Sequence, residues 1–341
     1  MKKTVLIYFF SDYNESFINL YASINKLGLL TPPNLYSIFI SKSISKIKDN
    51  SIIKKFNKHL QTNNDSDLSG YLEGLNNIET EDFDYFIFMN SSCIGPILPV
   101  YTKIQDWTSI FTSELDSNGL VAPIIEFPPF KDKYMNKIKT SDNFSSIKSL
   151  NSIPFAHSYF FALNKKSTSC IMKNNALPNK DLNKNDAVGT YERLITATLL
   201  NHKFTIKSFL YKYFFKEINK MTINKIISDE EFISFLKENK TDPETPNNGY
   251  FGSDLSPYEV VFYKNLRYPH SHRGIESAGI SKNNLNFLNN IIGLNKIRLK
   301  FNLEESIYLN EFENPVIFND KFLPINSLRK KIKKFLMNIF K

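Results

Sequence analysis

The chain contains several short runs of apolar residues, and each run ends at a polar turn. Residues 4–10, 85–89 and 155–163 are the most apolar of them, and each is too short for a typical helix. Aromatic and β-branched residues are common in these runs, which favours strands that are buried on both faces. Such strands are typical of the parallel sheets inside α/β proteins.

Helical patterns alternate with these strands. Apolar residues from Phe17 to Leu27 recur at helical spacing and stop at Gly28, a common C-terminal signal. Pro32 and Pro33 cannot continue that helix, and a strand over 35–40 follows. The other predicted elements are helices over 107–115, 185–199, 217–240 and 282–293, a weakly helical segment over 42–60, strands over 119–123 and 204–206, and loops over 61–69 and 127–152. This alternation predicts an α/β fold with a mostly parallel sheet flanked by helices.

A polar triplet, Asn90-Ser91-Ser92, follows the central apolar run directly. In open α/β sheets, ligands bind beyond the carboxyl ends of the strands, so this triplet would present donors and acceptors to a ligand. The alternative is a polar turn that caps a core strand and binds nothing, because turns favour the same residue types.

The composition indicates a globular protein. The chain has 341 residues, of which 42% are hydrophobic and 14% aromatic, and this excludes disorder as its general state. We expect a cytoplasmic location, because there is no apolar run of about 18 residues and the first strand begins immediately after Met1-Lys2-Lys3. Cys93 and Cys170 form neither a disulfide framework nor a zinc spacing.

The net charge of +9 is concentrated near the C-terminus, which argues against a nucleic-acid surface spread over the fold. Residues 325–341 combine an apolar helical stripe with a basic face, a pattern typical of a helix that lies on an anionic membrane. Two alternatives stay open. The helix could dock on the protein's own core, or the basic tail could bind nucleic acid with a steep salt dependence.

Common catalytic motifs are absent from the sequence. There is no glycine-rich dinucleotide fingerprint, no P-loop, no Gly-x-Ser-x-Gly elbow and no His-Glu-x-x-His site. His270, His272 and Arg273 could together hold a diphosphate or a metal, or they could form a solvated turn. Glu192 lies near the start of a predicted helix and could serve as a general base, although an ordinary helix-surface glutamate would look the same.

One set of residues shares its order and spacing with a known family. The set spans roughly residues 5–265 and consists of Asp84–Ser92 with Gly95, Pro96 and Pro99, Trp107 and Phe111, Leu120–Val121, His157 with Tyr159–Ala162, Glu192 with Leu194, Tyr250–Gly252 and Pro257–Phe262. With these residues the chain resembles nucleotide-sugar-dependent glycosyltransferases of the GT-A fold. More narrowly, it resembles glycosyltransferases encoded in bacterial surface-polysaccharide loci and in large DNA viruses.

The resemblance implies an inverting transferase that moves a hexosyl or deoxyhexosyl group from a nucleoside diphosphate sugar to a glycan or lipid-linked glycan in O-antigen or capsule synthesis. It implies Glu192 as the base, with Asp186 as second choice. The residues implied for nucleotide-sugar binding are Phe10, Ser11, Asp12, Asn90, Ser91, Ser92 and His157, and those for the diphosphate are His270, His272 and Arg273. We expect a GT-A-like core over 1–216, an extension that completes the acceptor side over 217–324, and the basic helix over 325–341, which would place the enzyme on the inner face of the membrane.

Metal use is left open by one departure from the family pattern. GT-A enzymes hold a divalent cation with an Asp-x-Asp motif, and this chain has Asn90-Ser91-Ser92 at the matching place. Neutral amide and hydroxyl oxygens are weak ligands for Mn²⁺ or Mg²⁺. The same departure supports an alternative from another class, a non-catalytic module that binds glycan or membrane on a transferase-like fold.

Overall fold

The structure is a computed structural model. It describes residues 2–11, 14–43, 47, 49–99, 101–102, 106–126, 153–179, 190–210, 218–228, 230, 255–265 and 282–303.

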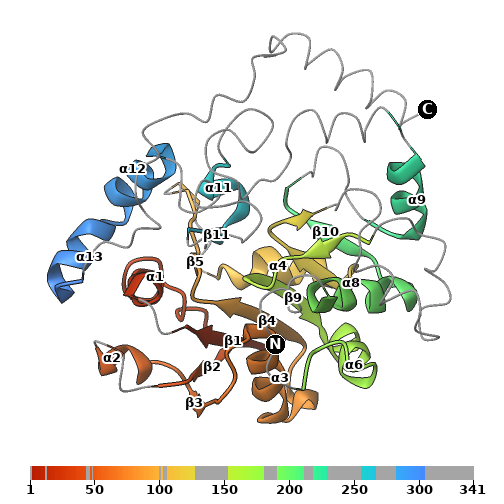
Figure 1. Ribbon diagram of the computed structural model, residues 1–341, viewed down its shortest axis with the longest axis horizontal. Coiled ribbons are helices and arrows are strands. Elements are labelled where there is room, and N and C mark those ends of the chain that lie inside the picture. The colour runs from red at the N-terminus through yellow and green to blue at the C-terminus, as the bar shows by residue number, and fades with distance from the viewer. Residues whose placement is uncertain are drawn as a thin grey trace, which may run out of the picture.

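A seven-stranded sheet in the order β10-β6-β9-β4-β1-β2-β3 forms the centre of the molecule (Figure 1). Its strands are β1 (Thr4–Phe10), β2 (Leu35–Ser41), β3 (Lys58–Gln61), β4 (Tyr85–Asn90), β6 (Leu120–Ala122), β9 (Phe160–Asn164) and β10 (Ile206–Ser208). Only β9 among these strands runs antiparallel, and it pairs with β4 and β6. The prediction of a mostly parallel α/β sheet is confirmed.

Helices cover both faces of the sheet, as predicted. The helices are α1 (Asn14–Asn25), α2 (Asn50–Ile53), α3 (Asp67–Asn76), α4 (Thr108–Leu115), α6 (Lys165–Lys173), α8 (Glu192–Asn201), α9 (Lys220–Ser228), α11 (Pro257–Val260), α12 (Lys282–Ile291) and α13 (Leu294–Phe301). Tyr71 of α3 contacts the ring of Phe161, and Phe111 of α4 contacts the ring of the adjacent Phe160. Because neighbouring strand residues point to opposite sides, α3 and α4 lie on opposite faces.

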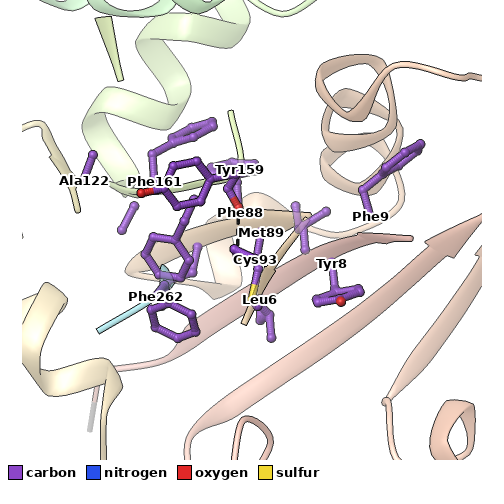
Figure 2. Packing of buried hydrophobic residues seen from close by; sticks show 14 of the residues in the cluster. Leu6, Tyr8, Phe9, Phe88, Met89, Cys93, Ala122, Tyr159, Phe161 and Phe262 are labelled. Atoms are coloured by element: carbon purple, nitrogen blue, oxygen red, sulfur yellow. Dashed lines mark hydrogen bonds between the residues drawn. The ribbon is translucent and has the colours of Figure 1, made fainter. Parts of the chain in front are cut away.

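The core is rich in stacked aromatic rings. Phe88 and Phe161 stack with centroids 4.7 Å apart, and Phe160 and Phe262 stack at 4.1 Å. Figure 2 shows the side chains of Phe88, Phe161 and Phe262 near Cys93. The contact with Phe262 ties the segment after α11 to the centre of the sheet.

Two glycines let α3 approach β1 closely. A Cβ atom on Gly70 would lie 2.3 Å from Phe9, and one on Gly74 would lie 2.6 Å from Ile7. Since Phe9 and Ile7 point to the same face of β1, larger residues at either glycine would push the helix off the sheet.

Two pairs of short strands and one short 3-10 helix accompany the main sheet. β5 (Cys93–Ile94) pairs antiparallel with β11 (Tyr263–Lys264), β7 (Ile125–Glu126) pairs antiparallel with β8 (Phe155–Ala156), and the 3-10 helix covers Thr80–Asp82. The prediction of one continuous strand over 155–163 was therefore wrong. A turn over 157–159 separates β8 from β9, because the polar His157 and Ser158 interrupt the apolar run.

Residues 294–303 pack on the first helix of the chain. The Phe301 ring lies 5.0 Å from that of Phe17 and 4.9 Å from that of Tyr21. Arg298 donates to Glu15 at 2.9 Å, and both side chains are buried. None of the helices in the described ranges is both long enough and apolar enough to cross a membrane. The expected boundaries at 216 and 324 stay predictions, and the predicted helix over 325–341 lies outside the described residues.

Candidate active site

The loops after β1 and β4 meet at the carboxyl edge of the sheet. β1 and β4 are parallel neighbours, so their ends lie side by side. The Ser11 backbone N–H donates to the Ser91 hydroxyl oxygen at 3.0 Å, and the two hydroxyls are 2.8 Å apart. Ser91 is completely buried, whereas Ser11 is half-buried. Ser91 therefore links the two loops from inside.

Asn90 uses both ends of its amide. Its Nδ2 donates to Asp67 Oδ2 at 2.6 Å, and its Oδ1 accepts from the backbone N–H of Ser92 at 2.9 Å and from the Ser92 hydroxyl at 2.5 Å. Asp67 begins α3 and also accepts the Leu68 N–H at 2.9 Å. A carboxylate thus stands beside the polar triplet, but it comes from a helix that the sequence pattern did not predict.

The donor set at this edge does not fit a divalent cation within the described residues. No group of three or more histidine, cysteine or acidic side chains that could hold a metal ion occurs in the described ranges. The Asn90 amide oxygen already accepts two hydrogen bonds from Ser92.

Glu192 is buried rather than solvated. It is the first residue of α8 and is 3% exposed. Its Oε1 accepts the backbone N–H of Ser158 at 2.7 Å, and its Oε2 has no hydrogen-bond partner among the residues that the structure describes. Burial raises the pKa of the Glu192 carboxyl above its ordinary value of 4.5, while the charge of His157, the Ser158 hydrogen bond and the charge of Lys264 act in the opposite direction.

The turn over 157–159 connects Glu192 to the polar triplet. The backbone N–H of Ser158 holds Glu192, and the carbonyl of the next residue, Tyr159, accepts the Asn90 N–H at 3.0 Å. The same carbonyl also accepts from Cys93 Sγ at 3.5 Å (Figure 2). The carboxylate and the loop after β4 therefore lie on two sides of one turn.

His157 is nearly buried and belongs to the surroundings of the carboxylate. Its Nε2 lies 3.3 Å from Glu126 Oε2, and its ring lies 5.2 Å from that of Phe155. Glu126, at the end of β7, was not selected from the sequence. Its neighbours offered no motif, and it is brought to His157 only by the pairing of β7 with β8.

Lys264 is a second residue that the sequence analysis missed. It lies opposite Cys93 in the β5–β11 pair, and its Nζ is 5.4 Å from the centroid of the Tyr159 ring. The next residue, Asn265, donates its backbone N–H to the Ser92 carbonyl at 3.2 Å. The only sequence signal was its position just after the apolar run that carried part of the resemblance.

Most of the residues selected from the sequence that the structure describes are brought to this edge. Ser11, Asn90, Ser91, Ser92, His157 and Glu192 form one connected region, and Phe10 is buried beside it with its ring 5.7 Å from that of Phe39. Their ligand-binding and catalytic roles stay predictions. The other selected residues lie outside the described ranges, namely Asp12, Asp186, His270, His272 and Arg273.

The fold places the chain among α/β proteins with a mostly parallel sheet flanked by helices. No protein-family model matches the chain, and no curated protein matches it.

Solved structures with low sequence identity are similar to parts of the chain. Mannosyltransferase PcManGT from Pyrobaculum calidifontis, in complex with GDP-Man and Mn²⁺, is 8% identical with a TM-score of 0.33 over 53% of this chain and 49% of that one. Mannosyltransferase Ktr4p from S. cerevisiae is 11% identical with a TM-score of 0.37 over 61% and 68%. S. aureus TarS is 10% identical with a TM-score of 0.37 over 71% and 45%. The match thus spans about half the length of the Pyrobaculum protein.

Proposed function

We propose that this protein is a glycosyltransferase that moves a sugar from a nucleoside diphosphate sugar to a hydroxyl group of a glycan or lipid-linked glycan. Glu192 carries the proposal. It is a buried carboxylate with one oxygen held by a backbone N–H and the other without a hydrogen-bond partner in the described part of the chain. It lies beside loops at the carboxyl ends of parallel strands, where α/β sheets bind nucleotides.

In the proposed reaction, ionised Glu192 takes the proton of the acceptor hydroxyl as that oxygen bonds to the anomeric carbon. The bond from the anomeric carbon to the diphosphate oxygen breaks on the opposite side, so the configuration inverts. The Ser158 N–H holds Oε1, which leaves Oε2 to receive the proton. A raised pKa supports this role because a general base works best when its pKa is close to the working pH.

The donor side of the proposal rests on the loops after β1 and β4. Ser11 and Ser92 are half-buried there and offer hydroxyl groups to the nucleotide. The Lys264 ammonium lies near the same edge, against the Tyr159 ring, and would balance charge on the leaving diphosphate. The proposal also includes hexosyl or deoxyhexosyl transfer in surface-polysaccharide synthesis, which the sequence resemblance supports. It includes attachment to an anionic membrane through residues 325–341, which their amphipathic, basic sequence pattern supports.

The proposal is tested by measuring release of the nucleoside diphosphate from a panel of nucleotide sugars, with and without Mn²⁺, for wild type, Glu192→Gln and Glu81→Gln. Glu81 is a matched control because it is exposed and pairs with Lys165 away from Glu192. We expect Glu192→Gln to lower kcat by about 10²–10⁴-fold with donor affinity kept, because general bases contribute that much. The control should match wild type.

Two results would overturn the proposal. If wild type neither binds nor turns over any donor, the non-catalytic module becomes the better interpretation. If Glu192→Gln turns over like wild type, Glu192 is not the base.

A further inference from the structure

A pair of buried asparagines joins the first helix to the segment after β11. Asn19 lies in α1 and Asn265 directly follows Lys264, and both are almost fully buried. Each side chain donates its Nδ2 to the Oδ1 of the other at 2.7 Å. Buried amides cost free energy unless they are hydrogen-bonded, and this pair meets that requirement by bonding reciprocally across the fold.

Two further hydrogen bonds of the pair end on the loop after β4. Asn19 Nδ2 also donates to the Ser91 carbonyl at 2.9 Å, and the Asn265 backbone N–H donates to the Ser92 carbonyl at 3.2 Å. The Ser91 hydroxyl in turn contacts Ser11 in the loop after β1. Asn19 and Asn265 therefore fix the Ser91–Ser92 backbone of the candidate donor site from the protein interior. Neither side chain is exposed to a ligand.

The same bonds fix the backbone next to Lys264. This residue is held on one side by the pairing of β11 with β5 and on the other by Asn265. The Lys264 ammonium lies against the Tyr159 ring. The Tyr159 carbonyl accepts the Asn90 N–H, and the N–H of the preceding residue, Ser158, donates to Glu192. A shift at Asn265 would therefore move a positive charge relative to both the carboxylate and the donor loop.

We propose that Asn19 and Asn265 are positioning residues that hold Lys264 beside Glu192 and fix the Ser91–Ser92 backbone in the geometry that sugar transfer requires. The catalytic part of this inference rests on the function proposed above. Neither residue touches substrate. They act through Lys264 and the loop after β4.

The test separates positioning from stability with a double substitution. Asn265→Leu alone leaves the Asn19 amide without its partner and should lower stability, whereas Asn19→Leu together with Asn265→Leu replaces both polar groups by apolar groups of similar size. We expect the double variant to recover much of the stability lost by the single variant, yet to keep a kcat about 10²-fold below wild type, because small misplacements near the chemistry have effects of that size.

Asn164→Leu serves as the control. The Asn164 amide donates to the carbonyls of Leu115 and Asn118, and Asn164 pairs with Tyr85 at the opposite end of β4. This control should lose stability without losing kcat per folded molecule. If the double variant regains wild-type kcat along with its stability, or if Asn164→Leu lowers kcat as much, the pair is only structural and the inference is overturned.

A second measurement does not need turnover. The pKa of Glu192 follows from the pH dependence of the difference in unfolding free energy between a protein and its Glu192→Gln variant. The charge of Lys264 lowers this pKa, so displacement of Lys264 in the double variant should raise it. If wild type turns over no donor, the proposed function fails while this measurement still tests positioning. An unchanged Glu192 pKa would overturn the positioning of Lys264 even in an active enzyme.

Discussion

Burial of Glu192 makes the stability of the fold depend on pH in a specific direction. The carboxyl is buried and its pKa is raised above the ordinary value of 4.5, with burial as the largest cause. Between that ordinary value and the raised pKa, the folded protein holds a proton that the unfolded chain has released. The contribution of Glu192 to the free energy of unfolding is therefore present at low pH. It is lost as pH rises through the pKa of Glu192 in the folded protein.

The substitution Glu192→Gln isolates this effect. Glutamine keeps an oxygen to accept the Ser158 N–H, but it does not titrate. We expect the two proteins to have similar unfolding free energies near pH 4, where Glu192 is mostly protonated in both states. As pH rises from the ordinary value of 4.5 to the raised pKa, the unfolding free energy of wild type should fall relative to that of the variant by up to about 1.4 kcal/mol per pH unit. This is the value for one proton. Above the folded pKa the difference should level off.

The assay is urea unfolding of wild type, Glu192→Gln and Glu81→Gln from about pH 4 to pH 8 at constant ionic strength. Glu81→Gln is the control because its side chain is exposed and pairs with Lys165. A difference for Glu192→Gln that does not change with pH, or that falls as pH rises, would refute the conclusion that Glu192 is a buried carboxyl with a raised pKa. It would also weaken the case for this residue as a base.

Three further predictions concern other parts of the chain. Arg298→Met should lower the unfolding free energy by about 3–5 kcal/mol, because it leaves the buried Glu15 carboxylate without this partner. Adding Glu15→Gln should recover most of this loss in the same urea assay. Lys264→Met should weaken binding of a nucleoside diphosphate about 10-fold by calorimetry, whereas Lys165→Met should not, and equal affinities would remove Lys264 from the donor site. Deleting residues 325–341 should abolish co-sedimentation with anionic vesicles, and unchanged binding would count against the membrane-bound helix.

The sheet could be predicted because its central strands carry their own signal. Every residue of β1 is buried, so its apolar run identified a strand covered on both faces without knowledge of its neighbours. The meeting of the loops after β1 and β4 followed from the rule for parallel strands. The antiparallel direction of β9 within the main sheet could not be predicted, because an apolar run such as 160–163 does not encode its direction.

The helix α3 could not be predicted, for a physical reason. The face that it turns to the sheet includes Gly70 and Gly74 beside Leu68, Tyr71 and Leu75, so the apolar stripe is interrupted and the helical pattern is weak. The need for glycine at these two positions comes from the close approach of Phe9 and Ile7, which the local sequence does not reveal. Missing the helix also meant missing Asp67 beside Asn90.

The environment of Glu192 could not be predicted from the sequence either. A glutamate in the first turn of a helix is usually solvated, whereas Glu192 is buried and accepts a hydrogen bond from Ser158, which lies 34 positions earlier. The Asn19–Asn265 pair is separated by 246 positions and carries no local pattern. In each case the residue type was visible, but its partner was set by the topology.

The direction of β9 explains why Glu192 and the loop after β4 lie at one edge of the sheet. Because β9 runs antiparallel to β4, its first residues lie at the carboxyl end of β4, and the turn before it enters the same edge. That turn gives one N–H to Glu192 and one carbonyl to Asn90. The separation between Glu192 and the loop after β4 is therefore set by hydrogen bonds of the adjacent Ser158 and Tyr159 backbone groups. The proposed sugar transfer would require such a fixed separation, since reacting atoms must be held at close approach.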